Sequence, residues 1–167
     1  MTALEPRARA SIDRVTAIAA GGNHTMVLTV GGAILGFGRN HKGQLGLGHA
    51  RNVWVPEAVQ IPSTSSQDSR RAVQVACGLD HSLALVLFNG GKDVFVTGEN
   101  QYGQLGLGPG AQRRVLSFTR VPGLSGGRVV CVMAGESHSA AVGYSGELFL
   151  WGRNDVGQLG LGDDLGR

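Results

Sequence analysis

Three histidines recur at a fixed interval, and they are the residues of this sequence best suited to do chemistry. They are His24, His81 and His138. The intervals, 81 minus 24 and 138 minus 81, are both 57 residues. An imidazole can ligate a metal ion or act as a general base, so each histidine needs an explanation. A hydroxyl residue follows each one directly, as Thr25, Ser82 or Ser139. No GxSxG turn and no placed carboxylate accompany these hydroxyls, so we do not expect them to be nucleophiles.

The equal spacing of the histidines argues against a metal site. A period of 57 residues places one histidine in each of three similar units, so the rings should lie on the order of 10 Å apart, like packed sheets. Ligands of one zinc ion must all reach it at about 2.0–2.1 Å. We therefore expect no metal and no cofactor. The predicted role is structural, a ring nitrogen that holds backbone near the inner edge of its unit, and contact with a partner is the alternative.

Two short glycine motifs resemble a loop that binds phosphate. They are the Gly-Leu-Gly stretches at 46–48 and 160–162. A dinucleotide site needs a helix directly after such a loop and a surrounding βαβ unit, and the pattern predicts neither. No other motif supports a covalent step, so we predict that the chain has no catalytic residue and is not an enzyme.

Composition favours turns and strands over helices. The 167 residues include 28 glycines but only 5 prolines, an excess of glycine that disfavours helix throughout. Fifteen Lys and Arg against twelve Asp and Glu give a net charge of +3, which permits an acidic partner without requiring nucleic acid. No apolar run reaches the length of a membrane span. The two cysteines, Cys77 and Cys131, sit in apolar runs without a CxxC motif, which favours an intracellular location, cytoplasmic or nuclear.

Each histidine belongs to a longer repeat that is typical of a small antiparallel sheet. A glycine stands three residues before each histidine, and these glycines are Gly21, Gly78 and Gly135. After the histidine come an apolar run, a glycine-containing turn and a second apolar run, which together predict a β-hairpin. Similar runs before the histidine and near the end of the period bring the total to four short strands. Four strands repeated at a fixed period predict the blades of a propeller.

An eleven-residue motif closes each hairpin. It reads GRNHKGQLGLG at 38–48, GENQYGQLGLG at 98–108 and GRNDVGQLGLG at 152–162. We predict a structural corner in which leucines anchor the turn between sheets. The asparagines suit an Asx turn or a left-handed backbone position, and they are Asn40, Asn100 and Asn154. The glutamines are expected to hold loop backbone by amide hydrogen bonds, and they are Gln44, Gln104 and Gln158.

The combined pattern resembles the repeat of the regulator of chromosome condensation family. The resemblance covers residues 15 to 162 and implies an all-β propeller with about three four-stranded blades. We expect a flexible tail over 1–14 and repeats over 15–72, 73–128 and 129–167, the last truncated. The family's ring resembles seven blades. The resemblance therefore implies an incomplete ring, uncovered blade faces prone to association, and a fragment of a longer regulatory protein.

The two residues between the glycine and the histidine vary from repeat to repeat, and we predict a partner-binding surface there. The candidates are Asn23, Leu79, Asp80, Glu136 and Ser137. One hypothesis is a non-catalytic module that presents these loops to a protein partner. The alternative, implied by the resemblance, is a guanine-nucleotide exchange factor for a Ran-like small GTPase, in which Asp80 and Glu136 contact the GTPase. Chromatin contact through the arginines of the N-terminal tail is a weaker possibility because only three are present.

Overall fold

A computed structural model describes residues 13–63, 69–88 and 91–166, and these form three antiparallel sheets. The first sheet contains β1 (Val15–Ala20), β2 (His24–Thr29), β3 (Ile34–Gly38) and β4 (Val53–Val59). The second contains β5 (Arg71–Cys77), β6 (His81–Phe88), β7 (Gly91–Glu99) and β8 (Arg114–Arg120). A 3-10 turn, η1 (Pro122–Leu124), leads to the third sheet, which contains β9 (Val129–Ala134), β10 (His138–Gly143) and β11 (Leu148–Gly152).

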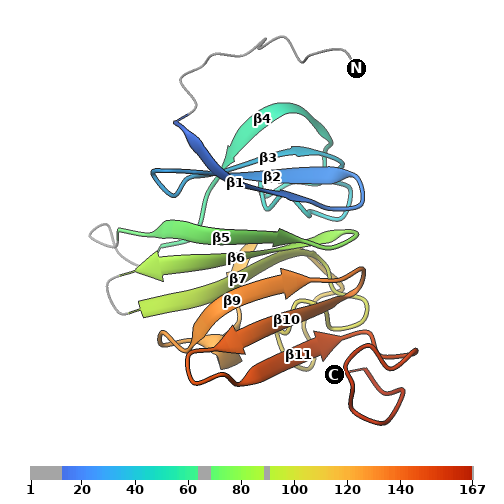
Figure 1. Cartoon of the computed structure of the whole chain (residues 1–167). Helices are drawn as coiled ribbons and strands as arrows, with labels where there is room; N and C mark the ends of the chain where they lie inside the picture. Colours follow the sequence, from blue (N-terminus) through green and yellow to red (C-terminus); the bar gives the residue numbers. More distant parts are fainter. Residues whose placement is uncertain (1–12, 64–68, 89–90, 167) are drawn as a thin grey trace, which may run out of the picture.

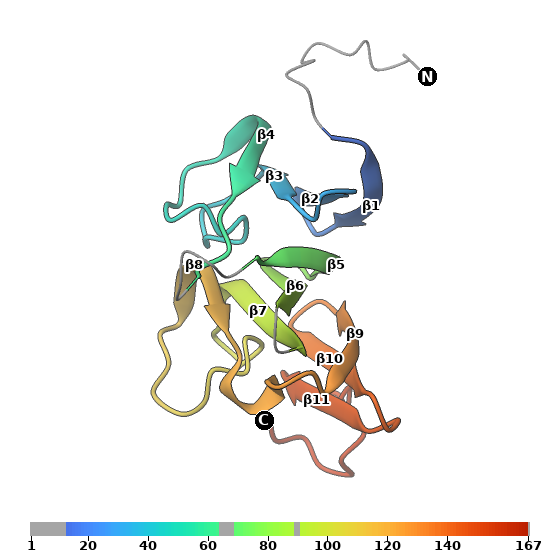
Figure 2. The same ribbon diagram turned by 90° about the vertical axis from the view of Figure 1, so that its left-hand side faces the viewer.

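Each sheet is a simple meander, as the hairpin pattern predicts. The strand orders are β1-β2-β3-β4, β5-β6-β7-β8 and β9-β10-β11, with antiparallel pairing throughout. The all-β prediction is confirmed, and the first two sheets have the four strands expected of a blade. The third sheet has three strands, because the described residues after β11 form turns and coil. The sheets follow one another from top to bottom of Figure 1 and are seen from the side in Figure 2.

The middle sheet is covered on both faces, and the alternation of side chains along β6 explains how. Ala84 and Val86 pack into a cluster with residues of the first sheet, while Leu83 and Leu85 pack into a cluster with residues of the third. All four side chains are buried. A strand covered on both faces is expected to be an almost continuous apolar run, as LALV is. The first strands of the sheets also meet, because β5 contacts both β1 and β9.

The outer faces of the first and third sheets are uncovered in this structure. Ile18 on β1 is 68% exposed, whereas Val75, 57 residues later on β5, is 8% exposed. On the other end, Met133 and Leu148 are 63% and 65% exposed. The uncovered apolar faces expected of an incomplete ring are therefore present. The tail predicted over 1–14 lies outside the described residues except for its last two positions. No helix in the described part of the chain is long and apolar enough to span a membrane.

Candidate functional site

The Gly-x-x-His turns are shaped by the imidazole ring, which lies directly against the glycine. A Cβ atom on Gly21 would come within 2.2 Å of Cε1 of His24, and the same clash occurs at Gly78 and Gly135. The Gly21 amide also donates a hydrogen bond to the His24 carbonyl at 2.9 Å, which closes the turn. Glycine is therefore required at this position by close packing and not only by backbone conformation.

Each of the first two histidines bonds to the hydroxyl that follows the next histidine. Nε2 of His24 lies 2.8 Å from Oγ of Ser82, and Nε2 of His81 lies 3.0 Å from Oγ of Ser139. Both serine hydroxyls donate onward to a corner carbonyl, that of Gln44 at 2.7 Å for Ser82 and that of Gln104 at 2.8 Å for Ser139. A hydroxyl has one proton to donate, so Nε2 must be the donor to the serine. The hydrogen-bond pattern thus assigns the Nε2–H tautomer to both rings.

Burial keeps these two histidines neutral. Removal from water lowers the pKa of His24 to about 4, and the negative charge of Asp80 opposes this shift only partly. Burial also lowers the pKa of His81 to about 4, with further lowering from the charges of His24 and His138. Their Nδ1 atoms are buried and have no hydrogen-bond partner in the described structure. A neutral ring whose donor is already committed to a serine is a structural link and not a general base.

The predicted role of the histidines needs one correction. Structural use is observed, but the ring reaches backbone through a serine of the next sheet and not directly. The signal in the sequence was the hydroxyl that follows every histidine. A second link between sheets is not predicted from the sequence. The Gln74 side-chain amide on β5 makes two hydrogen bonds to the backbone of Val132 on β9, at 2.8 and 3.0 Å.

The eleven-residue corner is held together by its asparagine and glutamine side chains. Oδ1 of each asparagine accepts a hydrogen bond from the amide of the leucine five residues on, at 2.9–3.0 Å. The left-handed backbone expected for the asparagines is wrong, because every positive φ angle in the described chain belongs to glycine. The Asx turn is also wrong, since the bond spans five residues instead of two. The prediction for Gln44, Gln104 and Gln158 is confirmed: each Oε1 accepts from the amide two residues earlier, at 2.9–3.0 Å.

An aromatic residue at the end of the third hairpin packs against the corner of the preceding repeat. Nε1 of Trp151 donates to the Gln104 carbonyl at 2.9 Å, and its ring lies against Gly106. Thr97 occupies the matching position of the second repeat, and there Phe118 from β8 lies beside Gly46 together with Thr97. The smaller Thr97 is thus accompanied by the buried ring of Phe118, which comes from β8 of the same sheet. Trp54 on β4, by contrast, does not pack in this way, because it is 90% exposed.

The variable loop residues lie side by side. The Gly22 amide donates to the Gly78 carbonyl at 3.2 Å, and the Leu79 amide donates to the Glu136 carbonyl at 3.0 Å, so the three turns are joined by backbone. Three of the five candidate side chains are exposed, namely Asn23, Leu79 and Glu136.

The other two candidates are less accessible. Asp80 is half-buried, and its Oδ1 accepts a hydrogen bond from Nε2 of Gln44 at 2.7 Å. Ser137 is 6% exposed, so it borders this surface without presenting a side chain. Glu136 lies 3.9 Å from a guanidinium nitrogen of Arg153, with two thirds of its side chain in solvent. Two carboxylates therefore lie near the joined turns, one held by a hydrogen bond to Gln44 and one largely exposed to solvent.

The described residues contain no group of three or more His, Cys, Asp or Glu side chains that could hold a metal ion. Comparison with known families decides the classification. The model of the regulator of chromosome condensation (RCC1) repeat matches residues 31–85, 93–142 and 145–167. The chain belongs to the RCC1 repeat family. A second RCC1 repeat model matches residues 15–44 and 72–104.

Several curated proteins and solved structures share these RCC1 repeats. The chain is 38% identical over 152 residues to the ultraviolet-B receptor UVR8 of Arabidopsis thaliana, covering 90% of this chain and 32% of that protein. It is 40% identical over 151 residues to the probable E3 ubiquitin-protein ligase HERC4 of Mus musculus, covering 90% and 13%. It is 33% identical over 151 residues to the secretion-regulating guanine nucleotide exchange factor of Bos taurus, covering 85% and 30%.

The structural match supports the same fold. The crystal structure of Prp20p from Saccharomyces cerevisiae, described with its binding properties to Gsp1p and histones, superposes with a TM-score of 0.76 at 25% identity. The match covers 93% of this chain and 37% of that one. The chain thus spans about a third or less of the length of these relatives, and they share RCC1 repeats while differing in named activity.

Proposed function

We propose that the chain is a non-catalytic protein-interaction module that presents its Gly-x-x-His turns to a protein partner. The observation that carries this proposal is the pair of backbone hydrogen bonds that join the three turns, Gly22 to Gly78 and Leu79 to Glu136. They bring residues 57 positions apart into one surface, and that surface varies in sequence while its frame is constant. Loops held by a rigid scaffold are where binding residues concentrate.

The chemistry of the turns supports binding over catalysis. The histidines and serines are used as links between sheets, and both linked imidazoles are neutral and buried. The exposed groups at the turns are an amide, an apolar side chain and a carboxylate, contributed by Asn23, Leu79 and Glu136. An apolar contact flanked by polar groups is a common arrangement at the centre of a protein interface. The proposal includes a cytoplasmic or nuclear location for the protein.

Site-specific crosslinking tests the interaction surface. A photoreactive amino acid at Leu79 should crosslink a partner protein in cells that express the full-length protein, and the crosslink should weaken when Glu136 is changed to Lys. The same photoreactive residue at Trp54, which is more exposed but lies on β4, is the matched control. Equal crosslinking from both positions would contradict a binding surface at the turns.

A second candidate is guanine-nucleotide exchange on a Ran-like small GTPase. It is favoured by the exchange-factor relative and by the Prp20p structure, whose description names Gsp1p and histones. Asp80 and Glu136 would then be the groups that contact the GTPase. The full-length protein should accelerate nucleotide release from such a GTPase, and an Asp80→Ala, Glu136→Ala variant should accelerate it less. No acceleration by the unmodified protein would exclude exchange and leave the interaction module. Histone contact belongs to the same candidate and is tested by binding to nucleosomes.

A further inference from the structure

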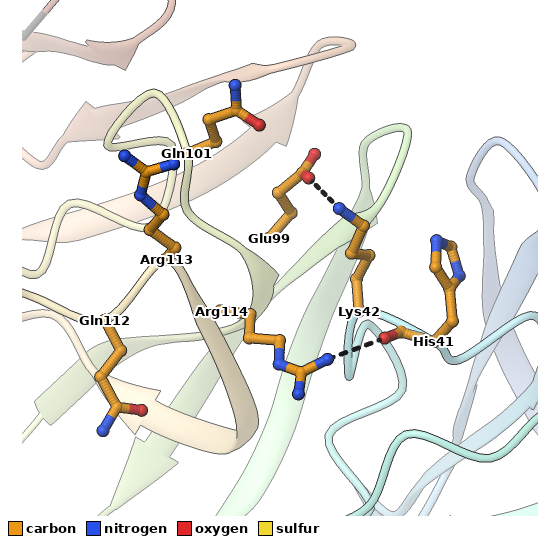
Figure 3. A pocket seen from close by; sticks show the side chains of 7 residues that line it. All are labelled: His41, Lys42, Glu99, Gln101, Gln112, Arg113 and Arg114. Atoms are coloured by element: carbon orange, nitrogen blue, oxygen red, sulfur yellow. Dashed lines mark hydrogen bonds and ion pairs between the residues drawn. The ribbon is translucent and has the colours of Figure 1, made fainter.

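A polar cleft of about 480 Å³ lies at the junction of the first two sheets. One wall is the first corner, with His41 and Lys42, and the other is the start of β8, with Arg114 and the preceding Arg113. Glu99, at the end of β7, lies between them (Figure 3). The volume falls within the roughly 300–1,000 Å³ typical of ligand sites.

The walls of this cleft are fixed by packing. Gly43 of the corner packs on Leu116 so closely that a Cβ atom would lie 2.6 Å from its side chain. The Gly48 amide donates to the Leu116 carbonyl at 2.8 Å, and Leu47 pairs with Ser117 in an isolated β-bridge. Across the opening, the Lys42 ammonium pairs with the Glu99 carboxylate, and Arg114 donates to the His41 carbonyl at 3.5 Å (Figure 3). The cleft is therefore preformed.

Its positive charge exceeds what its own acid can neutralise. Among the described residues, three cations line the cleft, and the one acidic lining residue, Glu99, is already paired with Lys42. Arg113 is exposed and has no ion-pair or hydrogen-bond partner for its guanidinium in the described part of the chain. Within the described residues, the Arg114 guanidinium makes only a long hydrogen bond, to the neutral carbonyl of His41. Two guanidinium groups that can each form bidentate bonds thus remain available to an external anion.

The corner motif does not dictate this chemistry. In the second repeat the positions of His41 and Lys42 are taken by Gln101 and Tyr102. Arg153 takes the position of Glu99 there and lies over the Tyr102 ring, 5.0 Å from its centroid. At the second junction, Tyr102 therefore stands where Lys42 stands at the first, and the positive Arg153 stands where the negative Glu99 does. The cationic cleft is a property of one junction and not of the repeat.

We propose that this cleft binds carboxylate side chains of an acidic segment in a protein partner, with Arg113 and Arg114 as the anion-binding groups. The inference rests on the proposed function as an interaction module and assigns it a second contact beside the turns. An acidic protein segment is favoured over nucleic acid because, among the described lining residues, only the guanidinium groups of Arg113 and Arg114 remain available in the cleft, and the net charge of the whole chain is only +3. A continuous phosphate backbone needs a longer row of cations than this.

The proposal is tested by fluorescence anisotropy. The intact chain is titrated into a labelled peptide in which glutamate alternates with glycine and serine. The peptide should bind, and an Arg113→Gln, Arg114→Gln variant should bind at least about tenfold more weakly, because charge-assisted bonds are lost. The matched control is Arg51→Gln, Arg128→Gln, which removes two exposed arginines outside the cleft and should bind as the unmodified protein does. Circular dichroism at matched concentration verifies that both variants are folded.

Four results would overturn the proposal. They are no binding by the unmodified chain, equal weakening in both variants, no weakening in the cleft variant, and tighter binding of a labelled oligonucleotide that the cleft variant alone loses. A peptide with phosphoserine in place of glutamate tests whether phosphate is the preferred anion, and preference for it would overturn the assignment to carboxylates. An Asp80→Asn, Glu136→Gln variant should keep peptide binding, so failure of this inference is distinguishable from failure of the turn surface.

Discussion

The stability of the fold should fall steeply below pH 6.5 because of two buried histidines. His24 and His81 have a pKa of about 4 in the folded chain, against about 6.5 when unfolded. The unfolded chain therefore binds more protons in this window. The stabilisation is fully present above the unfolded pKa and is lost as pH falls from 6.5 towards 4.

The magnitude follows from the two pKa values. For one histidine, lowering the pH from 7.5 to 5.0 should reduce the free energy of unfolding by about 2 kcal/mol. The two rings together should therefore reduce it by about 4 kcal/mol, which is a large part of the roughly 5–15 kcal/mol expected for a folded domain. Carboxylates contribute little over this range, because their unperturbed pKa values are near 4.

Urea denaturation at a series of pH values, followed by far-ultraviolet circular dichroism, measures this effect. The control is a His24→Gln, His81→Gln variant, in which an amide replaces each ring and neither position can titrate. The variant should be less stable at pH 7.5, and its stability should change by less than about 1 kcal/mol between pH 7.5 and 5.0. Parallel pH profiles for the two proteins would refute the assignment of neutral, buried imidazoles.

Two further changes test the links and the corner. Ser82→Ala should lower the free energy of unfolding by about 1–3 kcal/mol, because it leaves the buried Nε2–H of His24 without an acceptor. Ser145→Ala at an exposed turn should lower it by less than about 0.5 kcal/mol. Equal melting temperatures for the two variants would contradict the link. Gly106→Ala should cost at least about 1 kcal/mol more than Gly108→Ala, measured by urea denaturation. Both glycines have positive φ, but a Cβ atom on Gly106 would lie 2.9 Å from Nε1 of Trp151, whereas no atom of the described residues comes within 4 Å of a Cβ atom on Gly108. Similar costs for the two substitutions would refute the packing argument.

The sequence predicted the strands and the repeat well because apolar alternation and glycine turns act locally. It also predicted which glutamines stabilise the corner, since they bond only two residues away. The asparagine prediction failed because local turn chemistry was assumed, whereas the bond reaches a leucine five residues on. The third sheet has three strands in the described region, and the stretch after the third corner already lacked a fourth apolar run.

Contacts between sheets were harder to predict from the sequence. The bonds from His24 to Ser82 and from Gln74 to Val132 join residues 58 positions apart. A hydroxyl residue follows every histidine, but neither this pattern nor the stretch around Gln74 identifies the bonding partner. The cationic cleft is also invisible in sequence, because Lys42 and Arg113 meet only when the corner packs on β8. Such arrangements depend on how the sheets stack and not on the preferences of one segment.

The most direct test of the account is the protonation of the imidazoles, because the central claim is that the histidines are links between sheets and the loop residues are left free to bind. Long-range proton–nitrogen correlation spectra of the ¹⁵N-labelled chain at pH 7 report which ring nitrogen carries the proton. We predict neutral His24 and His81 with Nε2 protonated and Nδ1 bare. A charged ring, or a proton on Nδ1, at either position would contradict the link to serine and the structural role built on it.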